Sequence, residues 1–261
     1  MLTLYEHPLS PYAQKNKIAL REKGIEFDLA TPDAIGSGDT GGDFLNANPR
    51  GEVPALVDDG FAIFDSTIIL EYLEDKWPTP SLLPASAADR ARVRMIEDVM
   101  DTQFEAINWG LGEVAYFKRA DGAAADVIFK KAAAQTQGFF AWLEDQLGEA
   151  DWLNGASFGW GDLSVIPYVN GSASFGNTPL SGSKLEAWAA RTNARPAVAQ
   201  TAKEAAASIE GMTMVADIVE QGLFKREYRD HRLEWMVKTA GLDVIAKGLD
   251  KKNIRFSNDF S

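Results

Sequence analysis

The sequence predicts a small α/β domain followed by an all-helical domain. In the first 78 residues, short apolar runs alternate with amphipathic segments, and turn residues separate them. Beyond residue 86, apolar residues recur at steps of three and four, which is the period of a helix. A chain of 261 residues is long enough for two modest domains with their own cores. We divide it into an α/β domain over 1–78, a linker over 79–86, a helical domain over 87–210 and a C-terminal helical extension over 211–261.

Composition and charge exclude several classes of function. Acidic residues outnumber basic ones, 38 against 26, and the formal net charge of −12 would repel a polyanion, so we expect neither nucleic acid nor a membrane as a partner. The chain shows no secretory signal and no apolar run of about 18 residues, so we expect a cytoplasmic protein. Cysteine is absent, which excludes thiolate chemistry of the protein itself. His7 and His231 have no metal-binding partner near them in sequence, so we expect no metal.

The first domain opens with a strand over residues 2–5 and a helix. Ser10 and Pro11 begin that helix, because a serine side chain accepts from a free backbone N–H and a proline at the first position lacks a donor that would have no partner. Gly24 ends the helix. Residues 25–30 then read as a second strand.

The rest of the first domain reads as a loop, a hairpin and a helix. The glycine-rich stretch 35–43 lacks the spacing of a phosphate-binding motif, so we assign it no ligand. Residues 53–64 form two strands joined by a tight turn at 58–60. An amphipathic helix begins at Ser66 and ends before Pro78.

The second domain is predicted from helical periodicity. One apolar stripe over residues 93–114 indicates a continuous helix of about seven turns, and a second covers 132–147. Asp162 stands three residues after Gly159, the spacing of a capping box, and we interpret it as a folding residue. Helical spacing returns over 233–244 in the extension.

Three pieces of the first domain together resemble a known family. They are SPY at 10–12, NPRGEVPAL at 48–56 and DSTIILEYLED at 65–75. In this order and spacing, and over roughly residues 1 to 205, the chain resembles the cytosolic glutathione S-transferases of serine type. The resemblance implies a thioredoxin-like first domain that binds glutathione as co-substrate, and an all-α second domain.

The resemblance also implies that Ser10 stabilises the thiolate of glutathione. A free thiol has a pKa near about 8.5 and only its thiolate is a good nucleophile. A hydrogen bond to a charged group is worth about 1.5 to 3 kcal/mol, or about one to two pKa units, and the helix dipole favours the same charge. The residues alone favour an ordinary N-cap at Ser10, and it is the resemblance that favours the thiolate donor. Tyr12 is the alternative hydroxyl donor.

Four further residues are implied contacts of glutathione. Pro54 is expected to be cis, so that the backbone of Val53 pairs with the cysteinyl part of the ligand. Asp65 and Ser66 begin a helix, where a carboxyl and bare amides would hold the ammonium and carboxylate of the γ-glutamyl end. The alternatives are a proline before a strand and a simple capping pair.

Glu52 is implied as a glutathione contact and also departs from the family. Many members have Lys or Gln at this place, so the partner of the glycyl carboxylate is open. Arg50 or Lys15 could take that role.

The pocket for a hydrophobic substrate is expected on the long helix of the second domain. Trp109, Tyr116 and Phe117 lie where the family builds this pocket, although aromatic residues at helical spacing are also common in cores. The basic and aromatic run 224–235 is either a solvated helix face, a flap over the site or a dimer brace.

These observations predict a glutathione S-transferase whose bound thiolate attacks a hydrophobic electrophile by addition or displacement, with ether cleavage and dehalogenation among the options. The absent cysteine argues against disulfide exchange. The alternative is a non-catalytic ligand-binding or subunit protein of the same fold. A hydrolase using Ser10 is not supported, because no glycine elbow or triad surrounds it. The resemblance implies a homodimer, to which Phe44 or Phe64 could contribute.

Overall fold

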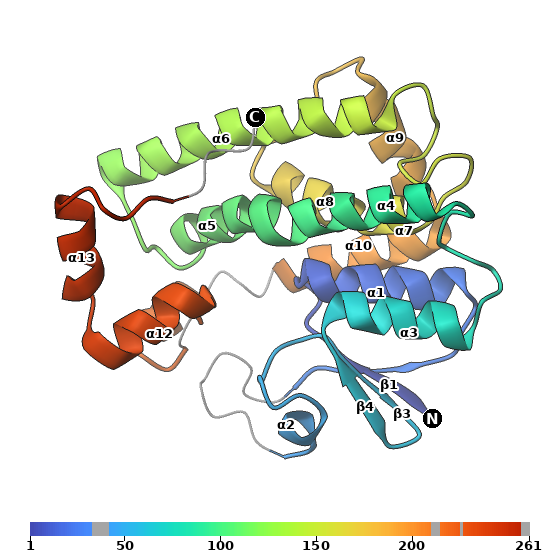
Figure 1. Ribbon diagram of the computed structural model, residues 1–261, viewed down its shortest axis with the longest axis horizontal. Helices are drawn as coiled ribbons and strands as arrows, with labels where there is room; N and C mark the ends of the chain where they lie inside the picture. The colour runs from blue at the N-terminus through green and yellow to red at the C-terminus, as the bar shows by residue number, and fades with distance from the viewer. Residues whose placement is uncertain (33–41, 210–214, 225–226, 257–261) are drawn as a thin grey trace.

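The computed structural model describes residues 1–32, 42–209, 215–224 and 227–256, and it shows an α/β unit followed by helices (Figure 1). The unit contains a four-stranded sheet in the order β2–β1–β3–β4. The central strand β1 runs parallel to β2 and antiparallel to β3, which pairs antiparallel with β4. The strands are β1 (Leu2–Tyr5), β2 (Asp28–Ala30), β3 (Ala55–Asp58) and β4 (Phe61–Phe64). The predicted hairpin is confirmed.

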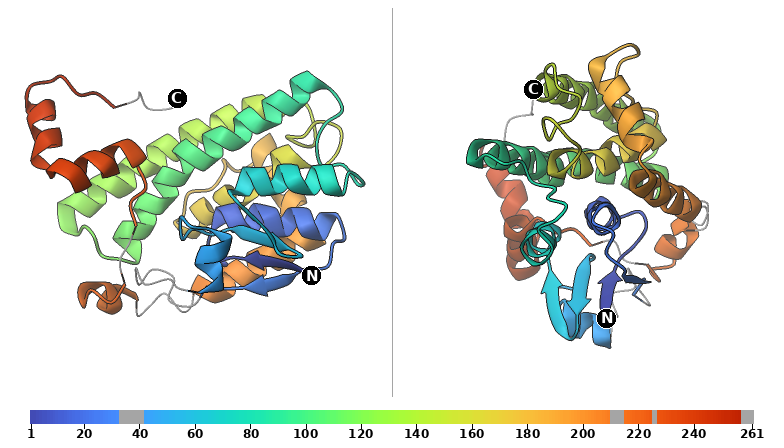
Figure 2. Two further views of the ribbon diagram at one scale, coloured as in Figure 1. Left: turned by 60° about the horizontal axis from the view of Figure 1, so that its bottom comes forward. Right: turned by 90° about the vertical axis from the view of Figure 1, so that its right-hand side faces the viewer.

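Helices α1 (Pro11–Glu22) and α3 (Ser66–Lys76) lie on one face of the sheet, between it and the helices of the second domain (Figure 2). The predicted start of α1 is confirmed, with Ser10 as its N-cap and proline at its first position. Gly24 has a φ of 65°, which a glycine adopts without steric cost just after a helix.

A short helix, α2 (Asp43–Ala47), was not predicted. It places Phe44 against the ring of Tyr5, with centroids 5.4 Å apart, in a small apolar cluster separate from the main core. Phe44 is therefore buried within the chain and Phe64 packs against the same cluster. Most of the glycine-rich stretch 35–43 lies outside the described residues.

The long helix of the second domain is continuous, as predicted, but it contains one irregular turn. α4 (Ala87–Val99) passes into a π-helical turn, η1 (Met100–Phe104), and then into α5 (Glu105–Ala115). α6 (Gly122–Leu147) packs along it. The remaining helices of the domain are α7 (Trp160–Leu163), α8 (Ile166–Ser174), α9 (Lys184–Asn193) and α10 (Pro196–Ile209).

Asp162 acts as the predicted folding residue. Its buried carboxylate accepts from the Gly159 amide at 3.0 Å, from the Leu153 amide at 2.8 Å and from the indole of Trp188 at 2.7 Å. Burial nevertheless raises the pKa of Asp162 to about 6. The carboxylate thus ties the loop before α7 to α9.

The C-terminal extension contains α11 (Val215–Glu220), α12 (His231–Ala240) and α13 (Asp243–Asp250). Helices α12 and α13 lie beside the ends of α5 and α6, away from the other helices of the second domain (Figures 1 and 2). Within the described ranges, no helix is both long enough and apolar enough to cross a bilayer.

Candidate functional site

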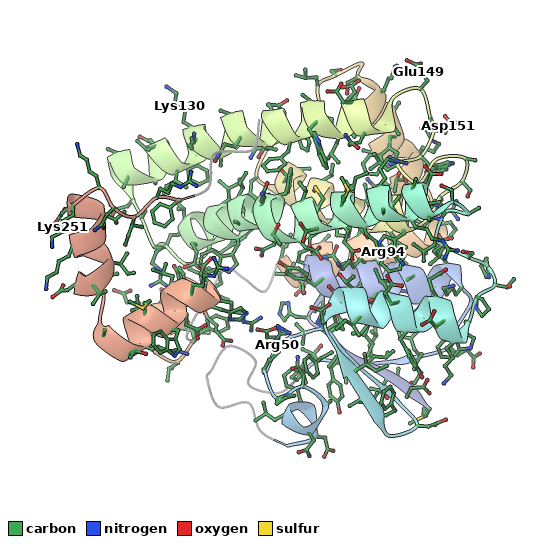
Figure 3. The ribbon with its side chains drawn as sticks, viewed as in Figure 1. Arg50, Arg94, Lys130, Glu149, Asp151 and Lys251 are labelled. Atoms are coloured by element: carbon green, nitrogen blue, oxygen red, sulfur yellow. The ribbon has the colours of Figure 1, made fainter. Side chains whose placement is uncertain are left out.

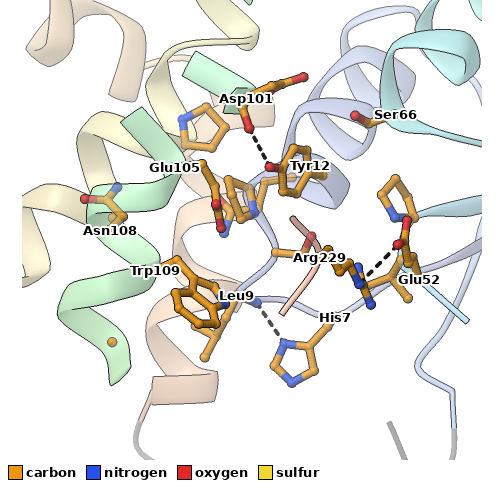
Figure 4. Close-up of a pocket in the computed structure, with 18 of the residues that line it drawn as sticks. His7, Leu9, Tyr12, Glu52, Ser66, Asp101, Glu105, Asn108, Trp109 and Arg229 are labelled. Atoms are coloured by element: carbon orange, nitrogen blue, oxygen red, sulfur yellow. Dashed lines mark hydrogen bonds and ion pairs between the residues drawn. The ribbon is translucent and has the colours of Figure 1, made fainter. Parts of the chain in front are cut away.

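A cavity of about 1470 Å³ lies where the first domain, α5 and the extension meet (Figure 4). Of the site residues proposed from the sequence, Lys15 does not line this cavity, whereas the catalytic, glutathione-contact and substrate-pocket residues all do, although they come from four separate stretches of the chain. They are Ser10, Tyr12, Glu52, Val53, Pro54, Asp65, Ser66, Trp109, Tyr116 and Phe117.

The Ser10 hydroxyl combines a capping role with a free donor. Its oxygen accepts from the Ala13 amide at 3.3 Å, which makes Ser10 the N-cap of α1. In the described part of the chain this is the one hydrogen bond of the hydroxyl, so its proton remains available to a ligand in the cavity. The capping interpretation and the thiolate-donor hypothesis are therefore compatible.

Tyr12 already uses its hydroxyl group. The phenol donates to the backbone carbonyl of Asp101 at 2.6 Å, as Figure 4 shows, and its ring meets that of Tyr168 edge-on at 6.1 Å. Burial, together with the negative charges of Glu105 and Asp101, raises the pKa of Tyr12 far above its ordinary value. The geometry thus favours Ser10 over Tyr12 as the donor to a sulfur.

Lys15 cannot serve the glycyl end of a ligand. Its side chain is 0% exposed, and its ammonium lies 2.5 Å from both Glu97 and Asp101. Burial alone would lower the pKa of Lys15, but the carboxylates of Asp101 and Glu97 raise it. The cation is fully committed to joining α1 to the second domain.

The loop before β3 is held by its own side chains. The Asn48 amide group donates to the Glu52 carbonyl at 2.7 Å and accepts from the Arg50 amide at 3.0 Å. The peptide bond between Val53 and Pro54 is cis, as the resemblance implies. These contacts fix the backbone of Val53 on the cavity wall.

The start of α3 differs in one respect from the expectation of bare amides. Asp65, with a φ of 78°, caps the helix, and its carboxylate accepts from Thr67 at 3.0 Å and Ile68 at 3.2 Å. Those two amides are therefore not available to a ligand. Within the described ranges, the amide and hydroxyl of Ser66 have no recorded partner, so they are the donors left for a carboxylate.

Glu52 is paired with arginines on both sides. The Nε of Arg229, in the extension, lies 3.1 Å from one carboxylate oxygen, and the Nε of Arg50 lies 3.6 Å from the other. Figure 3 shows Arg50 between α12 and the first domain, and Figure 4 shows the pair with Arg229. Arg229 was not identified as a site residue from the sequence, although it lies in the basic and aromatic run at 224–235.

Aromatic side chains of α5, of the two residues after it and of the extension form the opposite wall; Tyr116 and Phe117 were predicted on the long helix but follow its last residue, Ala115. Trp109 meets Tyr228 edge-on with centroids 4.4 Å apart, and Phe117 stacks on Phe224 at 5.7 Å. The Tyr228 hydroxyl also donates to Glu113 at 3.1 Å. Residues 224 and 227–231 of the run line the cavity, so at these positions the run is not simply a solvated helix face.

Both histidines line the cavity as well. The Nδ1 of His7 accepts from the Leu9 amide at 3.2 Å, and the imidazole of His231 lies 3.6 Å from Glu234. Among the described residues, no group of three or more His, Asp or Glu side chains is placed to hold a metal ion.

The thioredoxin-like sheet, the helical second domain and the cavity between them define a fold of the glutathione S-transferase class. The family model described as glutathione S-transferase, N-terminal domain, matches residues 9–76. The chain is 31% identical over 204 residues to glutathione S-transferase GstB of Escherichia coli K12, covering 76% of this chain and 88% of that protein. It is 30% identical over 234 residues to protein LigF of Sphingobium sp. SYK-6, covering 76% and 91%.

Among solved structures, rice GST1 in complex with glutathione superimposes with a TM-score of 0.69 at 25% identity, covering 83% of this chain and 98% of that one. A match to a stringent starvation protein A homolog of Coxiella burnetii is 36% identical over 96 residues, but it covers only 37% of this chain and 44% of that protein. The chain therefore belongs to the glutathione S-transferase family.

Proposed function

We propose that this protein is a glutathione S-transferase in which Ser10 stabilises the thiolate of bound glutathione for attack on a hydrophobic electrophile. The observation that supports this most directly is the unused hydroxyl proton of Ser10 at the N-terminus of α1, on the cavity that Val53 and Ser66 also line. A hydroxyl donor and the positive end of a helix both favour a negative sulfur.

The test is a titration of thiolate absorbance for glutathione bound to the wild type, to Ser10→Ala and to Tyr12→Phe. We expect the wild type and Tyr12→Phe to hold the thiol pKa below about 8.5 by one to two units, and Ser10→Ala to return it toward that value. A wild type that binds glutathione with an unshifted thiol pKa would instead support the alternative, a ligand-binding protein of the same fold.

The electrophile is proposed to be aromatic, because Trp109, Tyr116 and Phe117 line the cavity beside the extension. The relative LigF, whose structure has been solved, is a beta-etherase. In the corresponding displacement here, the thiolate forms a carbon–sulfur bond while the carbon–oxygen bond breaks and the aryl oxygen leaves with the electron pair. Glutathione-dependent release of a phenol from an aryl ether, compared with release of halide from an aryl halide, separates ether cleavage from dehalogenation.

We further propose a cytoplasmic homodimer, an expectation supported by the family resemblance. Light scattering of the purified protein would give twice the chain mass of 28.5 kDa for a dimer. A mass equal to that of a single chain would contradict it.

A further inference from the structure

We propose that Arg229, from the C-terminal extension, binds the glycyl carboxylate of glutathione together with Arg50. The inference rests on the proposed function, since it takes glutathione as the ligand. It assigns a binding residue outside the stretch that resembles the family, and it explains how a chain with glutamate at position 52 can accept an anionic ligand.

The charge of the cavity makes such a cation necessary. Its described lining carries many carboxylates, and these would repel glutathione, which has two carboxylates and one ammonium. Among the described lining residues the only lysine or arginine side chains are those of Arg50 and Arg229. The acidic lining residues are Glu52, Asp65, Asp98, Asp101, Glu105, Glu227 and Asp230.

The two ends of glutathione have different charges, and the cavity has two matching places. The γ-glutamyl end carries an ammonium and a carboxylate, which suit the Asp65 carboxylate and the donors of Ser66 at the start of α3. The glycyl end carries a carboxylate alone, which suits a guanidinium pair. Arg50 and Arg229 both pair with the carboxylate of Glu52, and Arg229 also pairs with Glu227, so the two cations balance the two carboxylates at this place.

Arg229 keeps donors for a ligand while Glu52 holds it. A guanidinium has five N–H groups. In the described structure Nε faces Glu52 at 3.1 Å and Nη2 donates to Glu227 at 2.9 Å, so further N–H groups remain. The side chain is 40% exposed and lines the cavity, which leaves it within reach of a ligand.

The position of Arg229 is fixed by contacts of its neighbour Tyr228 with the second domain. Tyr228 packs on Trp109 and donates to Glu113, both on α5, while Arg229 reaches Glu52 in the first domain. The segment therefore bridges the two domains across the cavity. If Arg229 binds the ligand, glutathione and the docking of the extension must strengthen each other, because coupling between two binding events is reciprocal.

The experiment compares glutathione with its glycyl monoethyl ester, which lacks that one negative charge, by titration calorimetry on the full chain. For the wild type we expect glutathione to bind about tenfold or more tightly than the ester, as a charge-assisted hydrogen bond implies. Arg229→Gln should weaken glutathione binding several-fold and leave the ester unchanged, so that the ratio collapses. The matched control is Arg232→Gln, an exposed arginine of α12 that does not line the cavity, which should keep the wild-type ratio.

Two further variants separate a loss of binding from misfolding and separate the contribution of Arg229 from that of Arg50. Arg229→Lys keeps the charge without the planar fork and should retain part of the ratio. Arg50→Gln alone should lower the ratio of the affinities for glutathione and its ester less than Arg50→Gln combined with Arg229→Gln does. An Arg229→Gln protein with the wild-type ratio, or a wild type that binds both ligands equally, would overturn the inference alone. A wild type that binds neither ligand would overturn the proposed function and the inference with it.

Discussion

The hydroxyl of Tyr12 and the backbone carbonyl of Asp101 join the first helix of one domain to the π-helical turn of the other, at 2.6 Å. In an α-helix that carbonyl would accept from the amide of Glu105, but here the Glu105 amide donates to Met100 instead. The irregular turn thus makes a backbone acceptor available to Tyr12.

Replacing Tyr12 by Phe removes this interdomain bond and leaves a buried acceptor with one donor fewer. We expect the free energy of unfolding to fall by about 1–2 kcal/mol, while the pKa of bound glutathione changes little. Urea unfolding measures the first quantity. Tyr5→Phe is the matched control, because no hydrogen bond of its hydroxyl is recorded among the described residues. Equal stabilities of the two variants would show that the bond to Asp101 does not contribute.

Replacing Lys15 by Met leaves Glu97 and Asp101 buried without their shared cation. We expect a loss of about 3–5 kcal/mol in the free energy of unfolding, since removing one partner of a buried pair leaves charge uncompensated. Chemical denaturation of both proteins provides the measurement. Lys130→Met, on the exposed surface of α6, should change stability by less than about 0.5 kcal/mol. A Lys15→Met protein as stable as the Lys130 variant would refute the assigned role.

Asp162 should give the protein a defined dependence of stability on pH. Its pKa is raised by burial to about 6 in the folded state, above the ordinary value of 3.8. The native state therefore holds the proton more tightly than the unfolded chain does. The stabilisation from this proton is complete below about 3.8 and is lost as the pH rises through about 6.

The measurement compares wild type and Asp162→Asn, which cannot titrate, by urea unfolding from pH 4 to pH 7. The stability of the wild type relative to the variant should decline by on the order of 2–3 kcal/mol as the pH rises across this range. Other carboxyl groups are common to both proteins and cancel. A difference that is flat in pH, or one that grows as the pH rises, would contradict the raised pKa.

The contact between Trp109 and Tyr228 should hold the extension on the cavity. A double-mutant cycle with Trp109→Ala and Tyr228→Ala is expected to give a coupling of about 0.5–1.5 kcal/mol, as edge-to-face aromatic pairs do. The free energy for the cycle is that of detaching residues 227–230 from the cavity, and amide hydrogen exchange of these residues measures it in each variant. Trp235→Ala, an exposed ring on α12, is the control and should leave the exchange rates unchanged. Additive effects of the two substitutions would mean that the rings do not hold the segment.

Local signals in the sequence predicted much of the fold. The pair Ser10 and Pro11 predicted the start of α1, and the turn residues at 58–60 predicted the hairpin of β3 and β4. The spacing of Asp162 from Gly159 predicted the capping box of α7. Each signal is confined to a few neighbouring residues, and capping and turn rules operate over that range. Helix α2 was missed because five residues after a glycine-rich stretch show no measurable period. The π-helical turn was missed because a single extra residue barely disturbs an apolar stripe.

The site was predictable only where it is built from local motifs. Glu52, Val53 and Ser66 belong to short motifs that resemble the family, and the structure gathers them on one cavity. The pairing of Glu52 with Arg229 joins residues far apart in the chain, so no spacing rule can reveal it. Lys15 reads as an ordinary charged residue of a helix, and only the structure shows that it is buried with Glu97 and Asp101 of the second domain.

The π-helical turn Met100–Phe104 provides a route by which the side of the cavity formed by α5 could change during evolution. One residue corresponds to about 100° of rotation around a helix, so a change of length by one residue at this point would turn all of α5 relative to α4. Val93 and Ile96 would keep their places in the core, while Trp109 and its neighbours would face a new direction. A lineage could in this way exchange one set of accepted electrophiles for another through an insertion or deletion, without substituting any residue of the wall itself.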